Sequence, residues 1–407
     1  MRIFLAVRHS INPDFYYGGL WSGNFYPALR RLGHEIIESE VDLLPASRFM
    51  HVACDFTPLE EETRARITEQ IIEEVRRAHS EQPLDLLLSY FYNAQFDPAG
   101  FDEIHRLGIP TVNFYCNSIY QFELVKDVAG RAHFSWHSER DAQSLYKNAG
   151  ANPVWVQMGA DPNVYHPHLQ KARQLKACFV GQRYADRDRL LVALISESVP
   201  VDIYGSGWDA KYVADSGKSS NGKETIYMGR ELLAAGSAKS YAQAGWQNFR
   251  RHGILGGVDR NARQLIYRSE SRRLDALLAS AARGFAGDIS ETFSEYEVIL
   301  NFSNVWADGR PGSRLIPHVR LRDFEAPMCR TCYLTGASDE IEEFYEVGKE
   351  IDTYSGAEEL VDKTKFYLAH PAQAEALREA GYRRATSDHT WERRFEQLFR
   401  KIGLANV

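Results

Sequence analysis

The sequence lacks any apolar run long enough to cross a membrane, and it lacks a dense pattern of cysteines. No stretch approaches the roughly 20 apolar residues that a membrane-spanning helix requires. The five cysteines are odd in number and scattered over 407 residues, which does not fit a disulfide framework. No secretory signal pattern precedes the predicted strand at residues 2–7. We therefore expect a cytoplasmic protein without membrane spans.

A strong positive charge is also missing. Lysine and arginine number 48 against 55 acidic residues, which gives a formal net charge of −7. Because a mildly acidic chain has no overall attraction to phosphate backbones, we expect no nucleic-acid partner.

One C-x-x-C motif, Cys329–Cys332, has neither a second cysteine pair nor a histidine at the spacing of a zinc site. It falls at the end of a predicted helix, whereas a thioredoxin-type motif stands at the start of one. We therefore expect a structural role for these two cysteines.

What the sequence does have is a repeated alternation of strands and helices. Buried strands are predicted at residues 2–7, 84–90 and 110–115, with helices between them, and this spacing implies parallel βαβ units. A polar, proline-marked linker follows at 159–168, and the alternation starts again at strand 176–180. The sequence thus predicts an α/β protein with two Rossmann-like domains facing a cleft.

The expected boundaries are residues 1–165 for the first domain and 166–388 for the second. Residues 209–285 interrupt the second domain as a helical insertion. Within it, segments 231–252 and 260–283 are rich in alanine and arginine and are joined by a basic turn. We expect this 231–283 hairpin to serve packing or a homodimer, and peripheral contact with a membrane surface or another polyanion is the alternative.

The stretch 315–325 combines cationic residues with a carboxylate at a predicted helix start. It follows strand 298–303 and a glycine-rich loop at 309–312. Such an arrangement can hold a phosphorylated sugar, although the stretch by itself also fits a surface loop with solvated arginines.

Four motifs in this order resemble those of a known family. They are Phe179–Arg187, Asn301–Ser303, Arg322–Glu325 and Trp391–Arg394. Together they resemble glycosyltransferases of GT-B fold, in particular the group 1 glycosyl transferases related to the spore maturation protein CgeB. The resemblance implies a nucleotide-sugar donor bound by the second domain, an acceptor bound by the first, and no obligatory metal.

In this fold one C-terminal helix usually crosses back to the N-terminal domain, and residues 389–407 contain the candidate. Its apolar residues Trp391, Phe395, Leu398 and Phe399 lie on one helical face. Packing of that face on its own domain remains the alternative.

Glycosyl transfer must stabilise a leaving diphosphate, which arginines, backbone N–H groups and helix N-termini can do. The family pattern G-x-x-Y-x-x-R is intact at Gly181, Tyr184 and Arg187, and it implies that Arg187 clamps the diphosphate. The resemblance assigns Glu325 to the ribose, whose two hydroxyls a carboxylate can accept at once. The other donor-binding candidates are Gly18, Gly19, Gly205, Trp208, Asn301, Ser303, Arg320, Arg322, Asp323 and Phe324.

Asp186-Arg187-Asp188 has the D-x-D form that binds metal in the other glycosyltransferase fold. Residues two apart do not face each other on a helix, and acidic residues at a helix start are expected from the helix dipole. We therefore expect no metal site and no cofactor besides the donor substrate.

An acceptor hydroxyl needs a general base, unless the leaving phosphate takes its proton. Candidate catalytic residues are His9, Asn117 and His137 at predicted strand ends, and His318 near the sugar end of the donor. Asn117 stands where related proteins often have an aspartate, which an amide cannot replace as a base. Pro317 stands where many retaining relatives carry a second glutamate, so the stereochemical outcome stays open.

The leading hypothesis is a metal-independent glycosyltransferase that uses a UDP-, GDP- or dTDP-sugar. Its acceptor would be a polysaccharide, a lipid-linked precursor, a protein or a small metabolite. The alternatives are a non-catalytic sugar- or nucleotide-binding scaffold of the same fold and a nucleotide-sugar epimerase.

Overall fold

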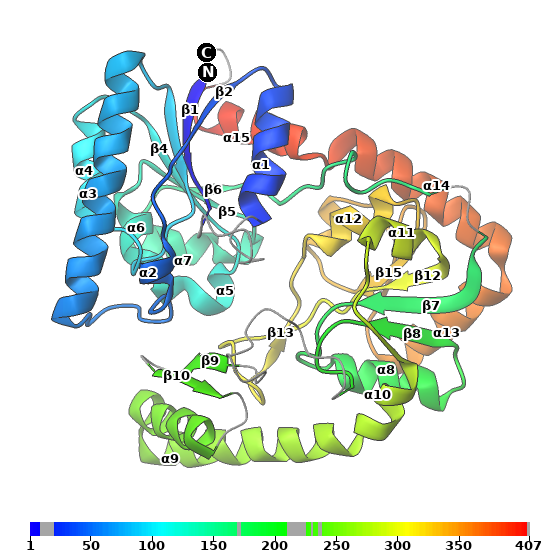
Figure 1. Ribbon diagram of the computed structural model, residues 1–407. Coiled ribbons are helices and arrows are strands. Elements are labelled where there is room, and N and C mark those ends of the chain that lie inside the picture. Colours follow the sequence, from blue (N-terminus) through cyan, green and yellow to red (C-terminus); the bar gives the residue numbers. More distant parts are fainter. Residues whose placement is uncertain (9–19, 169–171, 210–224, 229–230, 235–237, 405–407) are drawn as a thin grey trace. The chain divides into compact units, whose positions relative to one another are not determined.

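The computed structural model describes the chain except residues 9–19, 169–171, 210–224, 229–230, 235–237 and 405–407. The chain folds into two compact units, and each contains its own sheet and helices (Figure 1). Unit 1 comprises Met1–Gln157, Ser219–Gln243 and Trp391–Val407, and unit 2 comprises Met158–Lys218 and Ala244–Thr390. Unit 2 thus begins ahead of the boundary expected at residue 165.

Unit 1 contains a six-stranded parallel sheet in the order β2-β1-β3-β4-β5-β6. Every residue of β1, β3 and β4 is buried, because helices cover both faces of a parallel sheet. The strands are β1 (Arg2–Ala6), β2 (Glu35–Glu38), β3 (Leu86–Ser89), β4 (Thr111–Tyr115), β5 (Phe134–His137) and β6 (Pro153–Trp155).

The helices of unit 1 connect these strands. They are α1 (Leu20–Arg31), α2 (Leu44–Ser47), α3 (Pro58–Glu81), α4 (Ala99–His105), α5 (Ser118–Gln121), α6 (Lys126–Arg131) and α7 (Gln143–Asn148). The long helix α3 begins at a capping box. Thr57 accepts a hydrogen bond from the Glu60 backbone, and the Glu60 side chain accepts one from Thr57 N, while Pro58 occupies the first helical position.

The last helix, α15 (Trp391–Lys401), belongs to unit 1. The Trp391 indole donates to Asn24 Oδ1 over 2.9 Å. Its ring packs edge-on against Trp21 and Phe25 of α1, and Phe25 stacks on Trp136 of β5. The C-terminal end of the chain therefore completes an aromatic core that begins near the N-terminus.

Unit 2 contains a second six-stranded parallel sheet, in the order β11-β8-β7-β12-β15-β16. Counted within the unit, this is the strand order 3-2-1-4-5-6 of the Rossmann fold, with its topological switch point between β7 and β12. The strands are β7 (Gln174–Val180), β8 (Val201–Tyr204), β11 (Ala282–Gly284), β12 (Tyr296–Leu300), β15 (Cys332–Gly336) and β16 (Asp352–Tyr354). The two sheets confirm the predicted α/β class.

The helices of unit 2 include α8 (Arg187–Ser196), α10 (Asp275–Ala281), α11 (Ile289–Ser294), α12 (Arg322–Met328), α13 (Ala357–Ala369) and α14 (Pro371–Asp388). A small antiparallel pair, β13 (Val305–Trp306) and β14 (Leu315–Ile316), lies between β12 and α12 in the chain.

The C-x-x-C motif links α12 to β15. Cys329 and Cys332 are free and buried, and burial raises the pKa of both thiols.

The insertion contains β9 (Thr225–Met228), which pairs antiparallel with β10 (Glu231–Ala234), and the long α9 (Ala238–Arg273). The expectation of helix from residue 231 was therefore wrong at its start. α9 consists of two helices that meet at Gly253, whose φ of 68° favours glycine. Asn248 and Asn261 join them through a 2.6 Å hydrogen bond, so α9 is a helical hairpin. In the described part of the chain no helix is long and apolar enough to span a membrane.

Candidate functional site

The loops after β7 and β12 meet at the switch point of unit 2, where ligands of such sheets bind. Two contacts tie these loops together. Asn304 Nδ2 donates to Asp186 Oδ2 over 2.6 Å, and the Trp306 backbone N donates to the Tyr184 hydroxyl over 3.2 Å. The edge of the sheet at the switch point is therefore held in a fixed arrangement.

Arg187, the first residue of α8, is only 6% exposed. Its Nη1 donates to Gln182 O over 2.9 Å, and its guanidinium lies over the Phe179 ring at 5.4 Å. Within the described residues it forms no ion pair with a carboxylate. Burial, together with the nearby charge of Arg320, lowers the pKa of Arg187 to about 9. A buried cation without a counter-ion is costly, so this position favours an incoming anion.

Arg320 precedes α12 and is the second guanidinium at the switch point. Its Nη2 donates to Asn304 O over 3.4 Å, and no acidic side chain of the described chain is ion-paired with it. Its backbone N donates to Asp323 Oδ2 over 2.7 Å, which fixes the start of α12. Arg187 and Arg320 thus bring two positive charges to the same edge of the sheet.

Asp323 is buried and holds the neighbouring elements together. Its Oδ1 accepts hydrogen bonds from Asn301 Nδ2 at 3.2 Å and from the hydroxyls of Tyr333 and Thr335 at 2.9 Å each. Burial raises the pKa of Asp323, and these hydrogen bonds oppose that rise. Ser303 also contacts the Thr335 hydroxyl, at 3.0 Å. Both oxygens of the Asp323 carboxylate are therefore occupied by the protein itself.

Glu325 is 6% exposed and pairs with Arg322, whose Nη1 lies 2.8 Å from Glu325 Oε2. The Arg322 guanidinium lies 5.1 Å from the centre of the Phe293 ring. Burial and the Glu325 charge raise the pKa of Tyr165, which lies in the linker segment. The structure therefore joins Arg322 and Glu325 in one buried ion pair, whereas Arg187 and Arg320 have no such partner among the described residues.

Gly181 and Gly205 allow two strand-end loops to approach closely. A Cβ atom at Gly205, where φ is +122°, would lie 2.3 Å from Gly181 O. The Trp208 indole donates to the same carbonyl over 2.6 Å, and the ring packs edge-on against Phe179. Trp208 is 1% exposed and lies in the core of unit 2, so its place differs from that of an exposed stacking platform.

His137 lies at the carboxyl end of β5 in unit 1 and is fully buried. Its Nδ1 lies 2.9 Å from Glu139 O, and burial lowers the pKa of His137 to about 4. The ring is therefore neutral at pH 7.

Asn117, before α5, accepts a hydrogen bond from the Tyr120 hydroxyl over 2.8 Å.

Three predicted residues, His9, Gly18 and Gly19, lie outside the residues that the structure describes. In unit 2, Phe324 is buried against Phe344 and His389, and His318 is buried just before α12.

Sequence reasoning missed Asn304, Tyr333 and Thr335. Tyr333 and Thr335 carry hydroxyls within a strand that is otherwise apolar, which is a readable signal of a buried polar contact.

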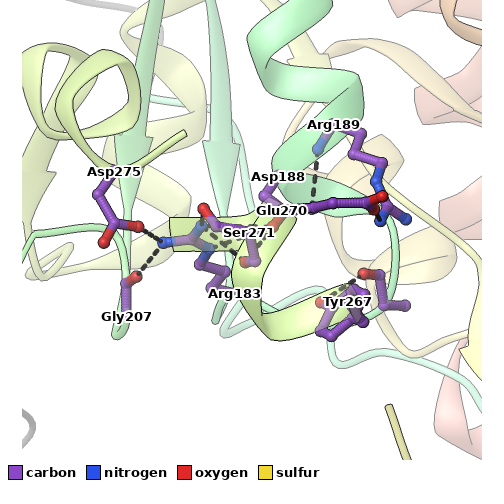
Figure 2. A network of polar contacts seen from close by, with 9 residues as sticks. Arg183, Asp188, Arg189, Gly207, Tyr267, Glu270, Ser271 and Asp275 are labelled. Atoms are coloured by element: carbon purple, nitrogen blue, oxygen red, sulfur yellow. Dashed lines mark hydrogen bonds and ion pairs between the residues drawn. The ribbon is translucent and has the colours of Figure 1, made fainter. Parts of the chain in front are cut away.

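The two aspartates of the D-x-D sequence point to different partners. Asp186 binds Asn304, whereas Asp188 accepts from Ser271 Oγ over 2.5 Å and pairs with Arg183. Figure 2 shows Asp188 in this network at the end of α9. Among the residues with described positions, no three His, Cys, Asp or Glu side chains are grouped to hold a metal ion.

Residues 264–400 match a family model described as "Glycosyl transferase-like". No curated protein matches the chain. Among solved structures it is similar to sucrose-phosphate synthase from Thermosynechococcus elongatus, with 14% identity, TM-score 0.55 and full coverage of both chains. A glycosyltransferase from Rickettsia africae gives 12% identity and TM-score 0.57, with 100% of this chain and 99% of that chain covered.

Anabaena HepE in complex with UDP and glucose is similar over 99% of both chains, with 11% identity and TM-score 0.55. Identities this low show a shared fold, and the fold of these structures is the one that the motifs implied. The chain therefore shares the GT-B architecture of these structures, and its residues 264–400 match the glycosyl transferase-like family model.

Proposed function

We propose that the protein transfers a sugar from a nucleoside-diphosphate sugar to a hydroxyl group of an acceptor, and that unit 2 binds the donor. The observation that carries the proposal is Arg187, a buried cation without a carboxylate partner in the described chain, beside Arg320 at the switch point. The similar HepE structures contain UDP, UDP with glucose, or UDP-glucose, which supports a UDP-sugar as donor. The motifs that resemble CgeB-related proteins support the same class.

The leaving diphosphate gains negative charge as the sugar–oxygen bond breaks. Arg187 and Arg320 would neutralise this charge through charge-assisted hydrogen bonds, which are strong in a site that excludes water. The backbone N–H groups at the start of α8 would add to the same field. In this proposal the two arginines take the role that a metal ion has in other transferases.

Glu325 would accept hydrogen bonds from the ribose hydroxyls, with one carboxylate oxygen still held by Arg322. On the acceptor side, His137 is the candidate for the general base, because its ring is neutral at pH 7 and can accept a proton. When Nδ1 carries the proton and donates a hydrogen bond to Glu139 O, Nε2 is left as a proton acceptor, and this atom has no hydrogen-bond partner among the described residues. His9, Asn117 and His318 stay predictions, and the leaving phosphate is the other possible base.

The test is thermal stabilisation of the purified protein by UDP, GDP and dTDP. A ligand at 100 times its Kd stabilises a protein by about 2.7 kcal/mol, which raises Tm by several degrees. Arg187→Gln should remove this shift, because the neutral amide no longer attracts the diphosphate. Arg383→Gln is the matched control, since Arg383 lies on the exposed side of α14 in the same unit. The donor site is refuted if none of the three nucleotides stabilises the wild-type protein.

Turnover is tested with UDP-glucose and other nucleotide sugars by measuring release of the nucleoside diphosphate. Release that depends on the presence of an acceptor supports a transferase. Binding without release over a broad acceptor panel would support the non-catalytic scaffold instead.

A further inference from the structure

The second helix of the α9 hairpin, residues 254–273, exposes an apolar stripe. Ile254 is 79% exposed and Leu255 is 87% exposed, which is unusual for residues of this size. Val258, Leu265 and Ile266 are also more than half exposed. Relative to Val258, Leu255 and Ile254 lie three and four residues earlier, and Leu265 and Ile266 lie seven and eight residues later. This spacing places all five side chains on one side of the helix.

The opposite side of the same helix is polar and buried. Arg260 is 8% exposed and pairs with Asp308 in the turn between β13 and β14. Gln264, which is 4% exposed, accepts from Asn248 Nδ2 over 3.3 Å across the hairpin. This helix is therefore inverted relative to an ordinary surface helix, whose apolar side faces the protein.

The hairpin is fixed to unit 2 by its polar side. At its base, shown in Figure 2, Arg183 Nη1 pairs with Asp275 at 2.7 Å and Arg189 pairs with Glu270 at 2.6 Å. The Tyr267 hydroxyl donates to Ala185 O over 2.8 Å. These contacts hold the apolar stripe on the outside.

Farther along the hairpin, Arg310 from the β13–β14 turn donates to Asn248 Oδ1 over 2.7 Å and to Gln247 Oε1 over 2.9 Å. Gly309–Gly312, which the sequence suggested as part of a phosphate loop, lies in this turn. A Cβ atom at Gly312 would lie 3.1 Å from the backbone of Arg263. The turn therefore packs closely against α9.

The charge of the hairpin indicates what covers the stripe. Residues 244–273 contain seven arginines against two acidic residues, a net charge of +5 in a chain of net charge −7. Arg250, Arg272 and Arg273 are exposed at the two ends of the stripe. If the same surface of a second copy covered the stripe, two hairpins of net charge +5 would face each other and repel. An anionic lipid surface satisfies both the apolar stripe and the arginines.

We propose that residues 254–273 dock on an anionic membrane surface, with the apolar stripe inserted at the level of the lipid headgroups and the helix parallel to the bilayer. This docking requires neither a membrane-spanning segment nor the donor site, so it stands independently of the transfer reaction.

The test is co-flotation of the full-length protein with vesicles of phosphatidylcholine alone or with added phosphatidylglycerol. We expect binding to the anionic vesicles that weakens as salt is raised. Ile254→Ser/Leu255→Ser should lower the partition coefficient by about tenfold or more, because each side chain contributes several buried carbon groups. Leu59→Ser/Leu175→Ser is the matched control, since both leucines are exposed outside the hairpin, and it should bind like the wild type.

Arg272→Glu/Arg273→Glu should weaken binding to anionic vesicles specifically. Circular dichroism and a thermal unfolding transition like that of the wild type confirm that each variant is folded. The proposal is overturned if the wild-type protein does not float with anionic vesicles, or if the Ile254/Leu255 variant floats equally well. It is also overturned if size-exclusion chromatography with light scattering shows a dimer that this variant dissociates, because a second copy would then cover the stripe.

Discussion

Arg322 Nη1 lies 2.8 Å from Glu325 Oε2 in the first turn of α12, and both side chains are largely buried. This ion pair stands where the resemblance places the ribose of the donor. It means that a substitution of Glu325 acts on the fold as well as on ligand binding, since removal of one partner leaves the other charge buried and uncompensated.

Glu325→Gln should therefore weaken UDP binding by about tenfold, equivalent to about 1.4 kcal/mol, and should also lower the free energy of unfolding. The ribose would lose a charged acceptor, and Arg322 would lose its counter-ion. Calorimetric titration with UDP and urea unfolding measure the two effects separately.

A double variant separates the fold from the ligand. Glu325→Gln/Arg322→Met should recover most of the lost stability, because no unpaired charge remains, while UDP binding stays weak. Recovery of both stability and binding in the double variant would exclude a direct ribose contact by Glu325.

The contact between Gly205 and Gly181 gives a second prediction. Gly205→Ala should destabilise unit 2 by roughly 2–5 kcal/mol, because the new Cβ atom would overlap Gly181 O at a positive φ. Gly287→Ala is the control, since a Cβ atom there meets no atom within 4 Å. Differential scanning calorimetry of the two variants makes the comparison. Equal Tm values would show that the loop relaxes without cost.

The apolar strands of both sheets could be predicted because each is a short run without alternation, which is typical of a parallel sheet. The ion pairs could not be predicted, because they depend on side-chain direction. Arg187, Arg320 and Arg322 look equivalent in the sequence, yet within the described part of the chain Arg322 alone among them has a carboxylate partner, at 2.8 Å. Trp208 after a strand end fits a ligand platform or a core residue equally well, and only its hydrogen bond to Gly181 O distinguishes them.

The buried ring of His137 predicts a pH dependence of stability. Its pKa is about 4 in the folded protein against 6.5 for an ordinary histidine, so between these values the unfolded chain binds more protons. Stability should fall by about 3 kcal/mol as pH decreases from 6.5 to 4.

His137→Gln should remove this contribution, and the exposed His252→Gln should leave it unchanged. Urea unfolding at several pH values gives the slope for each protein. A wild-type slope that His137→Gln does not reduce would assign the acid sensitivity to other groups.

Trp391 anchors α15 in unit 1. Trp391→Ala should cost about 3–5 kcal/mol, because a large buried side chain is replaced by a cavity. The control is Trp246→Ala, since Trp246 is 64% exposed and its removal leaves no cavity. Thermal unfolding followed by tryptophan fluorescence should show a lower Tm for the first variant only. A similar Tm for both would mean that the aromatic core of α1 is stable without α15.

The place of α15 also determines when each unit is able to fold during synthesis. Unit 1 needs both β1, which precedes all of unit 2 in the chain, and α15, which follows it, since unit 2 ends at Thr390. A ribosome therefore delivers all of unit 2 before the final helix of unit 1 has emerged. Until α15 emerges, Trp21 and Phe25 of α1 lack the ring of Trp391, and the nascent chain presents an apolar surface of the kind that chaperones protect. The unit that begins first is thus the unit that is completed last.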